Sequence, residues 1–267
     1  NGRIRLEENV PELFDAIFPP RCAGCDRRLG GGEAGLCANC RETTRRVSSP
    51  RCPTCALPRR GFSDRPSPGI DAPCRNCRHR PTAHRDSHAL WYYEGAVADA
   101  LQRAKYAGQI WRLRSLASPV GRWLGRLVAD GSLAAARPEG DTPLFTAVPM
   151  HPDELRERGF NAAIQLVRGE LAETDLQVRW ELVRKREPTP SQAGLTRSER
   201  RANVDGAFEI AEPAQIADRP VVLFDDVVTT GATTSEITAR LAAAGAEPIS
   251  VVSAARTPAS TPTLYPP

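Results

Sequence analysis

The sequence predicts an α/β protein with a mainly parallel sheet and helices on both faces, preceded by a small N-terminal double zinc ribbon. Two observations predict this class. All eight cysteines of the 267-residue chain lie in C-x-x-C pairs between positions 22 and 77. From Ala89 onward, short apolar runs alternate with helix-like patterns, as expected for a parallel sheet covered by helices. We therefore expect a ribbon unit over residues 18–80, an α/β domain over residues 89–256 and a disordered tail over residues 257–267.

The cysteine pairs predict two structural zinc sites. Their spacing is C-x2-C-x11-C-x2-C followed by C-x2-C-x18-C-x2-C. Two thiolates on one tight turn, closed by a second such turn, make the tetrahedral set that zinc prefers. A secreted disulfide framework or a single redox C-x-x-C motif explains four regular pairs less well. Spacing alone leaves both sequential and cross-braced pairing open. The candidate ligands are Cys22, Cys25, Cys37, Cys40, Cys52, Cys55, Cys74 and Cys77.

Apolar periodicity predicts the elements of the second unit. An amphipathic helix runs through Leu116–Val128, with Pro119 in its first turn. The charged, aperiodic span Arg184–Asn203 is expected to be a long exposed excursion, and Gly245 is expected to cap the last helix. The remaining helices are expected over Val97–Tyr106, from Phe160 to Leu171, and around Ile237 and Leu241. The expected strands are Leu90–Tyr93, Leu144–Val148, Leu176–Val183, Val221–Phe224 and Ile249–Val252.

Composition excludes several classes of protein. A net charge of +4, from 36 Lys+Arg against 32 Asp+Glu, implies neither a polybasic tail nor an obligate nucleic-acid surface. Lys105 and Lys185 are the only lysines, a bias that we attribute to genomic base composition. No apolar stretch is long enough to span a membrane, and no export signal opens the sequence. We therefore expect a cytoplasmic protein without membrane insertion.

The segment Val221–Thr234 carries the chemistry. A buried strand is expected to bring Asp225 and Asp226 to its carboxyl end, where open α/β sheets bind ligands. A hydroxyl-rich turn around Gly231 then leads into a helix whose first amides attract an anion. A phosphate site beside a pair of carboxylates that accept hydrogen bonds from a diol indicates a ribose 5-phosphate. The alternative to a ligand site is a purely structural one, in which the two aspartates precede a helix that a threonine caps. Walker A and dinucleotide-binding glycine motifs are absent from this segment.

This segment resembles the phosphoribosyl diphosphate (PRPP) motif of type I phosphoribosyltransferases. Three further features make the chain similar to the ComF family, which includes ComFC and GntX-like proteins, from about residue 18 to residue 256. They are Val148–His151 with Arg156–Asn161, Gln192 through Asn203, and the N-terminal C-x-x-C ribbons. The resemblance implies a double zinc ribbon with sequential cysteine pairing, followed by a type I phosphoribosyltransferase-like domain.

The resemblance also implies roles for individual residues. Asp225 and Asp226 would hold the ribose hydroxyls, and Arg184 and Lys185 would contact the diphosphate; these four are the candidate catalytic residues. Glu187–Asn203 would form a mobile hood, in which Gln192, Arg197 and Arg201 receive no individual role. The full candidate PRPP-binding set is Val148, Pro149, Met150, His151, Asp225, Asp226, Val227, Val228, Thr229, Thr230, Gly231, Ala232 and Thr233.

Two functions follow from the resemblance. In the first, the protein binds PRPP with magnesium and transfers phosphoribosyl to an unknown acceptor. In the second, it is a non-catalytic competence factor that binds single-stranded DNA within the DNA-uptake machinery and uses the PRPP site for ligand sensing. The arginines between positions 156 and 201 and the ribbons could follow a phosphate backbone. We expect Trp91–Tyr93 to pack in the core rather than to stack on bases.

Overall fold

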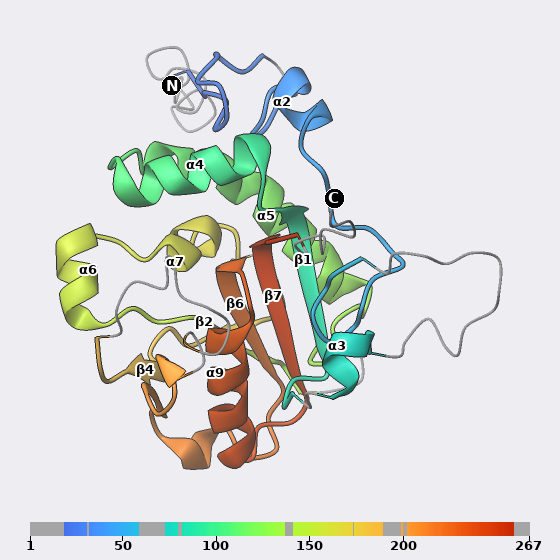
Figure 1. Cartoon of the computed structure of the whole chain (residues 1–267), viewed down its shortest axis with the longest axis vertical. Helices are drawn as coiled ribbons and strands as arrows, with labels where there is room; N and C mark the ends of the chain where they lie inside the picture. Colours follow the sequence, from blue (N-terminus) through green and yellow to red (C-terminus); the bar gives the residue numbers. More distant parts are fainter. Residues whose placement is uncertain are drawn as a thin grey trace, which may run out of the picture.

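The computed structural model describes residues 19–30, 32–58, 73–79, 82–136, 141–172, 174–188, 199 and 202–258. The expected hood residues Gln192, Arg197 and Arg201, and the tail from residue 259 onward, lie outside this described part. Figure 1 shows the ribbon segment with α2 (Ala38–Glu42) beyond one end of the sheet, and the segment with α3 (Arg75–Arg78) alongside the sheet.

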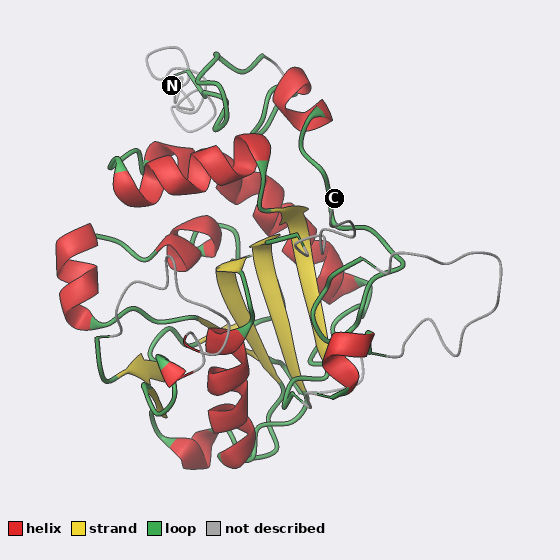
Figure 2. Cartoon of the chain, viewed as in Figure 1, coloured by secondary structure: helices red, strands yellow, loops and turns green. Residues whose placement is uncertain are grey.

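A five-stranded sheet with all neighbouring strands parallel forms the centre of the α/β domain (Figure 2). The strand order is β1-β7-β6-β2-β3. The predicted class, with a mainly parallel sheet, is confirmed. The strands are β1 (Asp86–Tyr92), β2 (Leu144–Ala147), β3 (Gln177–Val178), β6 (Val221–Val228) and β7 (Ile249–Arg256).

Helices cover both faces of this sheet because each strand interior is apolar on both sides. Val222 and Phe224 of β6 belong to a core shared with α4 and α5, whereas Val221 and Leu223 belong to a second core shared with α9. Figure 1 shows α9 in front of the sheet and α5 behind it. The principal helices are α4 (Gly95–Tyr106), α5 (Trp111–Ala129), α7 (Ala162–Val167) and α9 (Ala232–Ala243).

The prediction that Pro119 lies in the first turn of its helix is wrong. Helix α5 begins at Trp111, so the proline lies well inside it. The ring packs against the ribbon: a Cβ atom on Gly35 would lie 2.7 Å from the Pro119 Cγ and 3.0 Å from the Ser115 carbonyl oxygen. Proline has no backbone N–H to donate to the helical ladder, so one helical hydrogen bond is missing at the point where the ring contacts the ribbon.

The predicted strand Leu176–Val183 is two separate strands. Its first part is β3, at the edge of the main sheet, and its second part belongs to β4 (Val183–Lys185), which pairs antiparallel with β5 (Phe208–Ile210) in a small separate sheet. The start of the expected excursion at Arg184 is therefore ordered strand. Short elements that were not predicted include β5 itself, α6 (Pro152–Arg158) and the 3-10 helix η1 (Pro213–Gln215).

The central strands also extend further than predicted. Strand β6 continues through Asp225 and Asp226 to Val228, so the acidic pair lies inside the strand rather than at its tip. Gly245 follows α9 with a left-handed backbone (φ +89°), as predicted for the residue that ends this helix.

Candidate functional site

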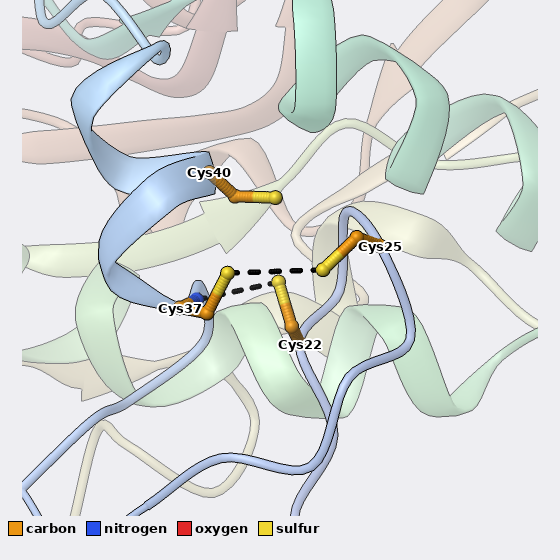
Figure 3. Close-up of side chains that lie close together, drawn as sticks. All are labelled: Cys22, Cys25, Cys37 and Cys40. Carbon is orange, nitrogen blue, oxygen red and sulfur yellow. Dashed lines mark hydrogen bonds between the residues drawn. The ribbon is translucent and has the colours of Figure 1, made fainter.

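The eight cysteines form two four-sulfur clusters. Figure 3 shows the sulfur atoms of the first cluster converging from the turn at Cys22–Cys25 and from the start of α2 (Ala38–Glu42). Within each cluster the sulfurs lie within 4.8 Å of one another, so the pairing is sequential. The clusters comprise Cys22, Cys25, Cys37 and Cys40, and then Cys52, Cys55, Cys74 and Cys77.

The two clusters repeat one local design. In each, the last pair begins a short helix, α2 or α3 (Arg75–Arg78), and the backbone N–H of its first cysteine donates to the first sulfur of the cluster, at 3.3 Å and 3.2 Å. A hydrogen bond from the Cys40 backbone N–H helps to lower the pKa of Cys37 to about 6. Such donors stabilise thiolates, which are the form that binds metal.

The cluster geometry fits zinc. Tetrahedral Zn–S bonds of about 2.3 Å place neighbouring sulfurs about 3.8 Å apart. The Cys25–Cys37 and Cys55–Cys74 sulfur separations are 3.7 Å and 3.9 Å. These eight cysteines account for the structural zinc ligands that the sequence predicts.

The first ribbon packs tightly on α4 and α5. The buried Arg112 side chain of α5 donates through Nη1 to the carbonyl oxygens of Ala23 and Gly24, inside the first C-x-x-C turn. A Cβ atom on Gly24 would lie 2.7 Å from the Cβ of Ala96, so the turn approaches α4 as closely as a glycine permits.

The second ribbon is attached to the sheet by buried polar contacts. His84 donates through Nε2 to the Thr54 carbonyl at 2.8 Å, and Arg51 donates to Nδ1 of His88 at 2.6 Å. Arg256, the last residue of β7, donates through Nε to the Cys55 carbonyl at 2.9 Å. His84 and His88 therefore help to fix the second ribbon on the α/β domain.

The acidic pair is buried in β6. The two side chains leave opposite faces of the strand, but their carboxyl groups lie close enough to interact. Successive strand residues alternate, so Asp226 shares the face of Phe224, and Asp225 shares that of Leu223. Asp225 accepts a hydrogen bond from the Asp226 backbone N–H at 2.9 Å. Burial, reinforced by the neighbouring Asp226 charge, raises the pKa of Asp225 well above its usual value.

A lysine that sequence reasoning did not assign to the site pairs with this acid. Nζ of Lys105, at the end of α4, forms an ion pair with Oδ2 of Asp226. Burial lowers the pKa of Lys105, but the Asp226 charge outweighs this effect and raises it. The signal was present in the sequence: a chain that uses arginine almost everywhere keeps only two lysines, and both lie at this site.

The turn after β6 offers backbone donors. Gly231 adopts φ +80° and precedes the first residue of α9. Among the described residues, the N–H groups of Thr230 and Gly231 have no hydrogen-bond partner, while the Ala232 N–H donates to Thr230 Oγ1 at 3.3 Å. Two open amides at the positive end of a helix form an anion-binding arrangement.

The Val148–His151 segment lies beside the acidic strand, because the Val148 N–H donates to the Phe224 carbonyl at 2.8 Å. The Asn161 side chain donates to the Val148 carbonyl at 2.9 Å and also caps α7. His151 caps α6 in a reciprocal arrangement with Glu154. The contacts of Asn161, His151 and Glu154 therefore fix the loop that follows β2.

Lys185 joins this loop, whereas Arg184 does not face the same group. Nζ of Lys185 lies 2.6 Å from Oε1 of Glu154, whose Oε2 accepts from the His151 N–H at 3.3 Å. Arg184 is exposed on β4. Of the two predicted diphosphate contacts, the structure therefore brings only Lys185 into the network around the Val148–His151 loop.

Comparisons with known proteins extend these observations. The double zinc ribbon domain family matches residues 13–80. Competence protein F of Haemophilus influenzae is 29% identical over 243 residues, covering 90% of this chain and 98% of the relative. The DNA utilization protein YhgH of Escherichia coli is 28% identical with the same coverage, and competence protein ComFC of Streptococcus pneumoniae is 26% identical over 85% of this chain and 90% of the relative.

A hypoxanthine phosphoribosyltransferase structure from Staphylococcus aureus also matches, with 15% identity over 55% of this chain and 68% of that chain, and a TM-score of 0.29. That score is too low to establish a shared fold. In the described parts of the chain, no helix qualifies as a membrane span; α5, the longest at 19 residues, carries arginines along its length.

Proposed function

We propose that the chain is a ComF-family protein, like the competence and DNA-utilisation proteins to which it is similar, and that it binds PRPP or another ribose 5-phosphate at the carboxyl edge of its sheet. The phosphate would bind the amides of the Thr229–Thr233 turn. The ribose hydroxyls would reach Asp225 and Asp226, and the diphosphate would extend toward the Val148–His151 loop.

The observation that carries this proposal is the open amide pair of Thr230 and Gly231 beside buried carboxylates. Asp225 accepts a backbone hydrogen bond and Asp226 pairs with Lys105, which leaves further acceptor capacity on both carboxyl groups. A diol can use this capacity because it donates two hydrogen bonds. A purely structural acidic helix entry would not require the amides of the next turn to stay open.

The residues also fit magnesium, provided that the ligand supplies most of the oxygens. Carboxylate and phosphate oxygens are the ligands that Mg²⁺ prefers. However, Asp226 is paired with Lys105, and Asp225 accepts from the Asp226 N–H, so neither side chain is free to surround an ion. The metal would be held chiefly by diphosphate and ribose oxygens and would neutralise charge on the leaving group.

If the protein is an enzyme, its reaction is transfer of phosphoribosyl to an acceptor with departure of diphosphate. Catalysis of this kind depends on positioning and on charge stabilisation. Lys185 is the residue best placed to follow the diphosphate, by exchanging Glu154 for it. The acceptor is the open part of this proposal, and a screen of candidate bases for diphosphate release addresses it.

Calorimetric titration of PRPP with magnesium tests the binding. The unmodified protein is expected to bind, and the Asp225→Asn variant to bind at least tenfold more weakly. The amide puts an N–H donor where an oxygen accepted from the diol, and a buried group left without its hydrogen bond costs about 1–3 kcal/mol. Asp218→Asn is the matched control, an exposed acid in the loop that precedes β6. Equal affinity in all three proteins would contradict the proposal that Asp225 contributes to PRPP binding.

The names of the relatives favour a second function, a role in DNA uptake or utilisation through binding of single-stranded DNA. Trp91 and Tyr92 are buried, so stacking on these rings does not support it. The test is salt-dependent binding of labelled single strands with and without PRPP. A steep salt dependence that PRPP alters supports a ligand-sensing role, and no binding at low salt contradicts it.

We also place the protein in the cytoplasm in this proposal. Eight cysteines that converge as two metal-type clusters are typical of a reducing compartment. Fractionation of cells with an antibody against the chain tests this location, and recovery outside the cytoplasm would contradict it.

A further inference from the structure

Arg256 joins the second cysteine cluster to the turn proposed to bind phosphate. The side chain is buried, with 3% of its surface exposed, and it ends β7 at the carboxyl edge of the sheet. It donates through Nε to the carbonyl of Cys55 at 2.9 Å, and through Nη1 to the carbonyls of Val228, at 2.8 Å, and Thr229.

These contacts determine which way the amides of the turn point. A peptide unit is planar and trans, so its carbonyl and its N–H point in opposite directions. The Val228 carbonyl shares a plane with the Thr229 N–H, and the Thr229 carbonyl shares one with the Thr230 N–H. Holding the Thr229 carbonyl on Arg256 therefore directs the Thr230 N–H, one of the two open amides, to the opposite side, where the anion would bind. The Val228 carbonyl is held in addition by the Thr257 N–H, at 3.1 Å.

Arg256 also contributes charge. A guanidinium is always protonated at physiological pH, so a positive charge lies directly beneath the turn. A buried charge interacts more strongly with an anion than an exposed one because water screens it less.

The residue that Arg256 contacts in the ribbon, Cys55, is itself a candidate zinc ligand through its sulfur. The Cys55 carbonyl is fixed only as firmly as the turn that carries Cys55, and four-sulfur ligation of zinc is what orders such a turn in a ribbon. Loss of zinc from this cluster would release the carbonyl, and with it one of the acceptors that hold the guanidinium.

We propose that Arg256 is a positioning residue through which the second cluster, and not the first, sets the amides of the phosphate turn. Zinc at Cys52, Cys55, Cys74 and Cys77 would therefore support affinity for a phosphate-bearing ligand, and this part rests on the function proposed above. The fixing of the turn itself does not depend on any ligand.

The first cluster provides a matched control. Arg112 is equally buried, at 3% exposure, and also donates to carbonyls of a C-x-x-C turn, those of Ala23 and Gly24. It also donates to Gln109, and its guanidinium lies 4.5 Å from the centroid of the Trp111 ring. Both residues lie at or just before the start of α5, so these contacts do not lead to the phosphate turn. The two arginines thus perform the same task for the two ribbons, but only Arg256 reaches the site.

Hydrogen–deuterium exchange on the zinc-loaded full chain tests this assignment. Arg256→Gln is expected to speed exchange in a peptide covering residues 228–234 about tenfold or more, the loss of one charge-assisted hydrogen bond. Arg112→Gln is expected to leave that peptide unchanged. Unchanged exchange in Arg256→Gln, or an equal increase in both variants, would overturn the proposal.

Cysteine variants keep the test decisive if Arg256→Gln fails to fold. Cys55→Ser is expected to lose one zinc and to speed exchange at residues 228–234, and Cys25→Ser to lose one zinc without that effect. Equal behaviour of the two variants would contradict the assignment. Titration of PRPP and of inorganic phosphate then gives a separate result. If the protein binds neither but shows the exchange difference, the proposed function is wrong, whereas the role of Arg256 in positioning the turn is supported.

Discussion

Nζ of Lys105 and Oδ2 of Asp226 form a buried ion pair that joins the end of α4 to the carboxyl-terminal part of β6. Only 16% of the lysine side chain and 12% of the aspartate side chain are exposed. Lys105 neutralises the charge of one of the two neighbouring carboxylates, which would otherwise repel each other in the strand. It also places a cation at the edge where a diphosphate ligand would arrive.

Removing one partner of this pair should destabilise the fold strongly. Lys105→Met leaves Asp226 buried without a counter-charge, which typically costs about 3–5 kcal/mol. Lys105→Met with Asp226→Asn should recover much of this loss because no charge is left uncompensated. Urea denaturation of the two variants and the unmodified protein measures the difference.

The exposed pair Arg240–Glu236 on α9 is the control for this prediction. Because water screens such pairs, Arg240→Met should cost about 1 kcal/mol or less. A Lys105→Met variant as stable as Arg240→Met would contradict the account of a buried pair.

Gly231 should be irreplaceable for ligand binding and only moderately important for stability. Its φ of +80° is strained by about 1–2 kcal/mol for any residue with a Cβ, although the nearest atom to a Cβ, Thr234 Oγ1, is 3.7 Å away. Gly231→Ala should therefore weaken binding of ribose 5-phosphate. Gly32→Ala, with φ +82° and nothing within 4 Å, should cost similar stability without changing affinity.

Asp225 should make stability depend on pH. Its folded pKa lies above the usual 3.8, first through burial and then through Asp226, so the folded state keeps a proton that the unfolded state loses. The free energy of unfolding should fall as pH rises above 3.8, by at most about 1.4 kcal/mol per pH unit. Asp225→Asn should remove this decline in urea denaturation across that range, and a decline that persists in the variant would assign it to another group.

Zinc content should separate sequential from cross-braced pairing. Cys25→Ser with Cys37→Ser disrupts one sequential cluster, so the protein should retain one zinc per chain. Cys25→Ser with Cys55→Ser disrupts both clusters and should retain none. Native mass spectrometry measures both, and the opposite pattern would show that the first and third pairs share an ion.

The sequence predicts elements well where apolar residues alone decide them. Strand β6 was found from Val221–Phe224, but its end was missed because Asp225 and Asp226 are polar residues buried by their partners. Strand β1 begins earlier than predicted for a similar reason: Asp86 pairs with His88 at 2.8 Å and accepts from Ser250 at 2.5 Å. Ser250, which partners Asp86, and Lys105, which partners Asp226, are distant in sequence, and no local pattern indicates them.

The same limit applies to the site. The turn at Gly231 could be predicted because a glycine-containing turn before a helix is a local signal, and the cysteine clusters because their spacing is regular. Lys105 and Arg256 were missed because each acts through a contact with a remote strand or ribbon. Pro119 was misplaced because the apolar periodicity was followed only from Leu116, whereas the helix already begins at Trp111.

The most direct test of the central claim compares ribose 5-phosphate with 2-deoxyribose 5-phosphate by calorimetry on the full, zinc-loaded chain. If the acidic pair holds a diol beside a phosphate, the protein binds the ribose compound at least tenfold more tightly, and Asp225→Asn with Asp226→Asn loses that preference. Equal affinity for the two sugars in the unmodified protein would contradict the claim.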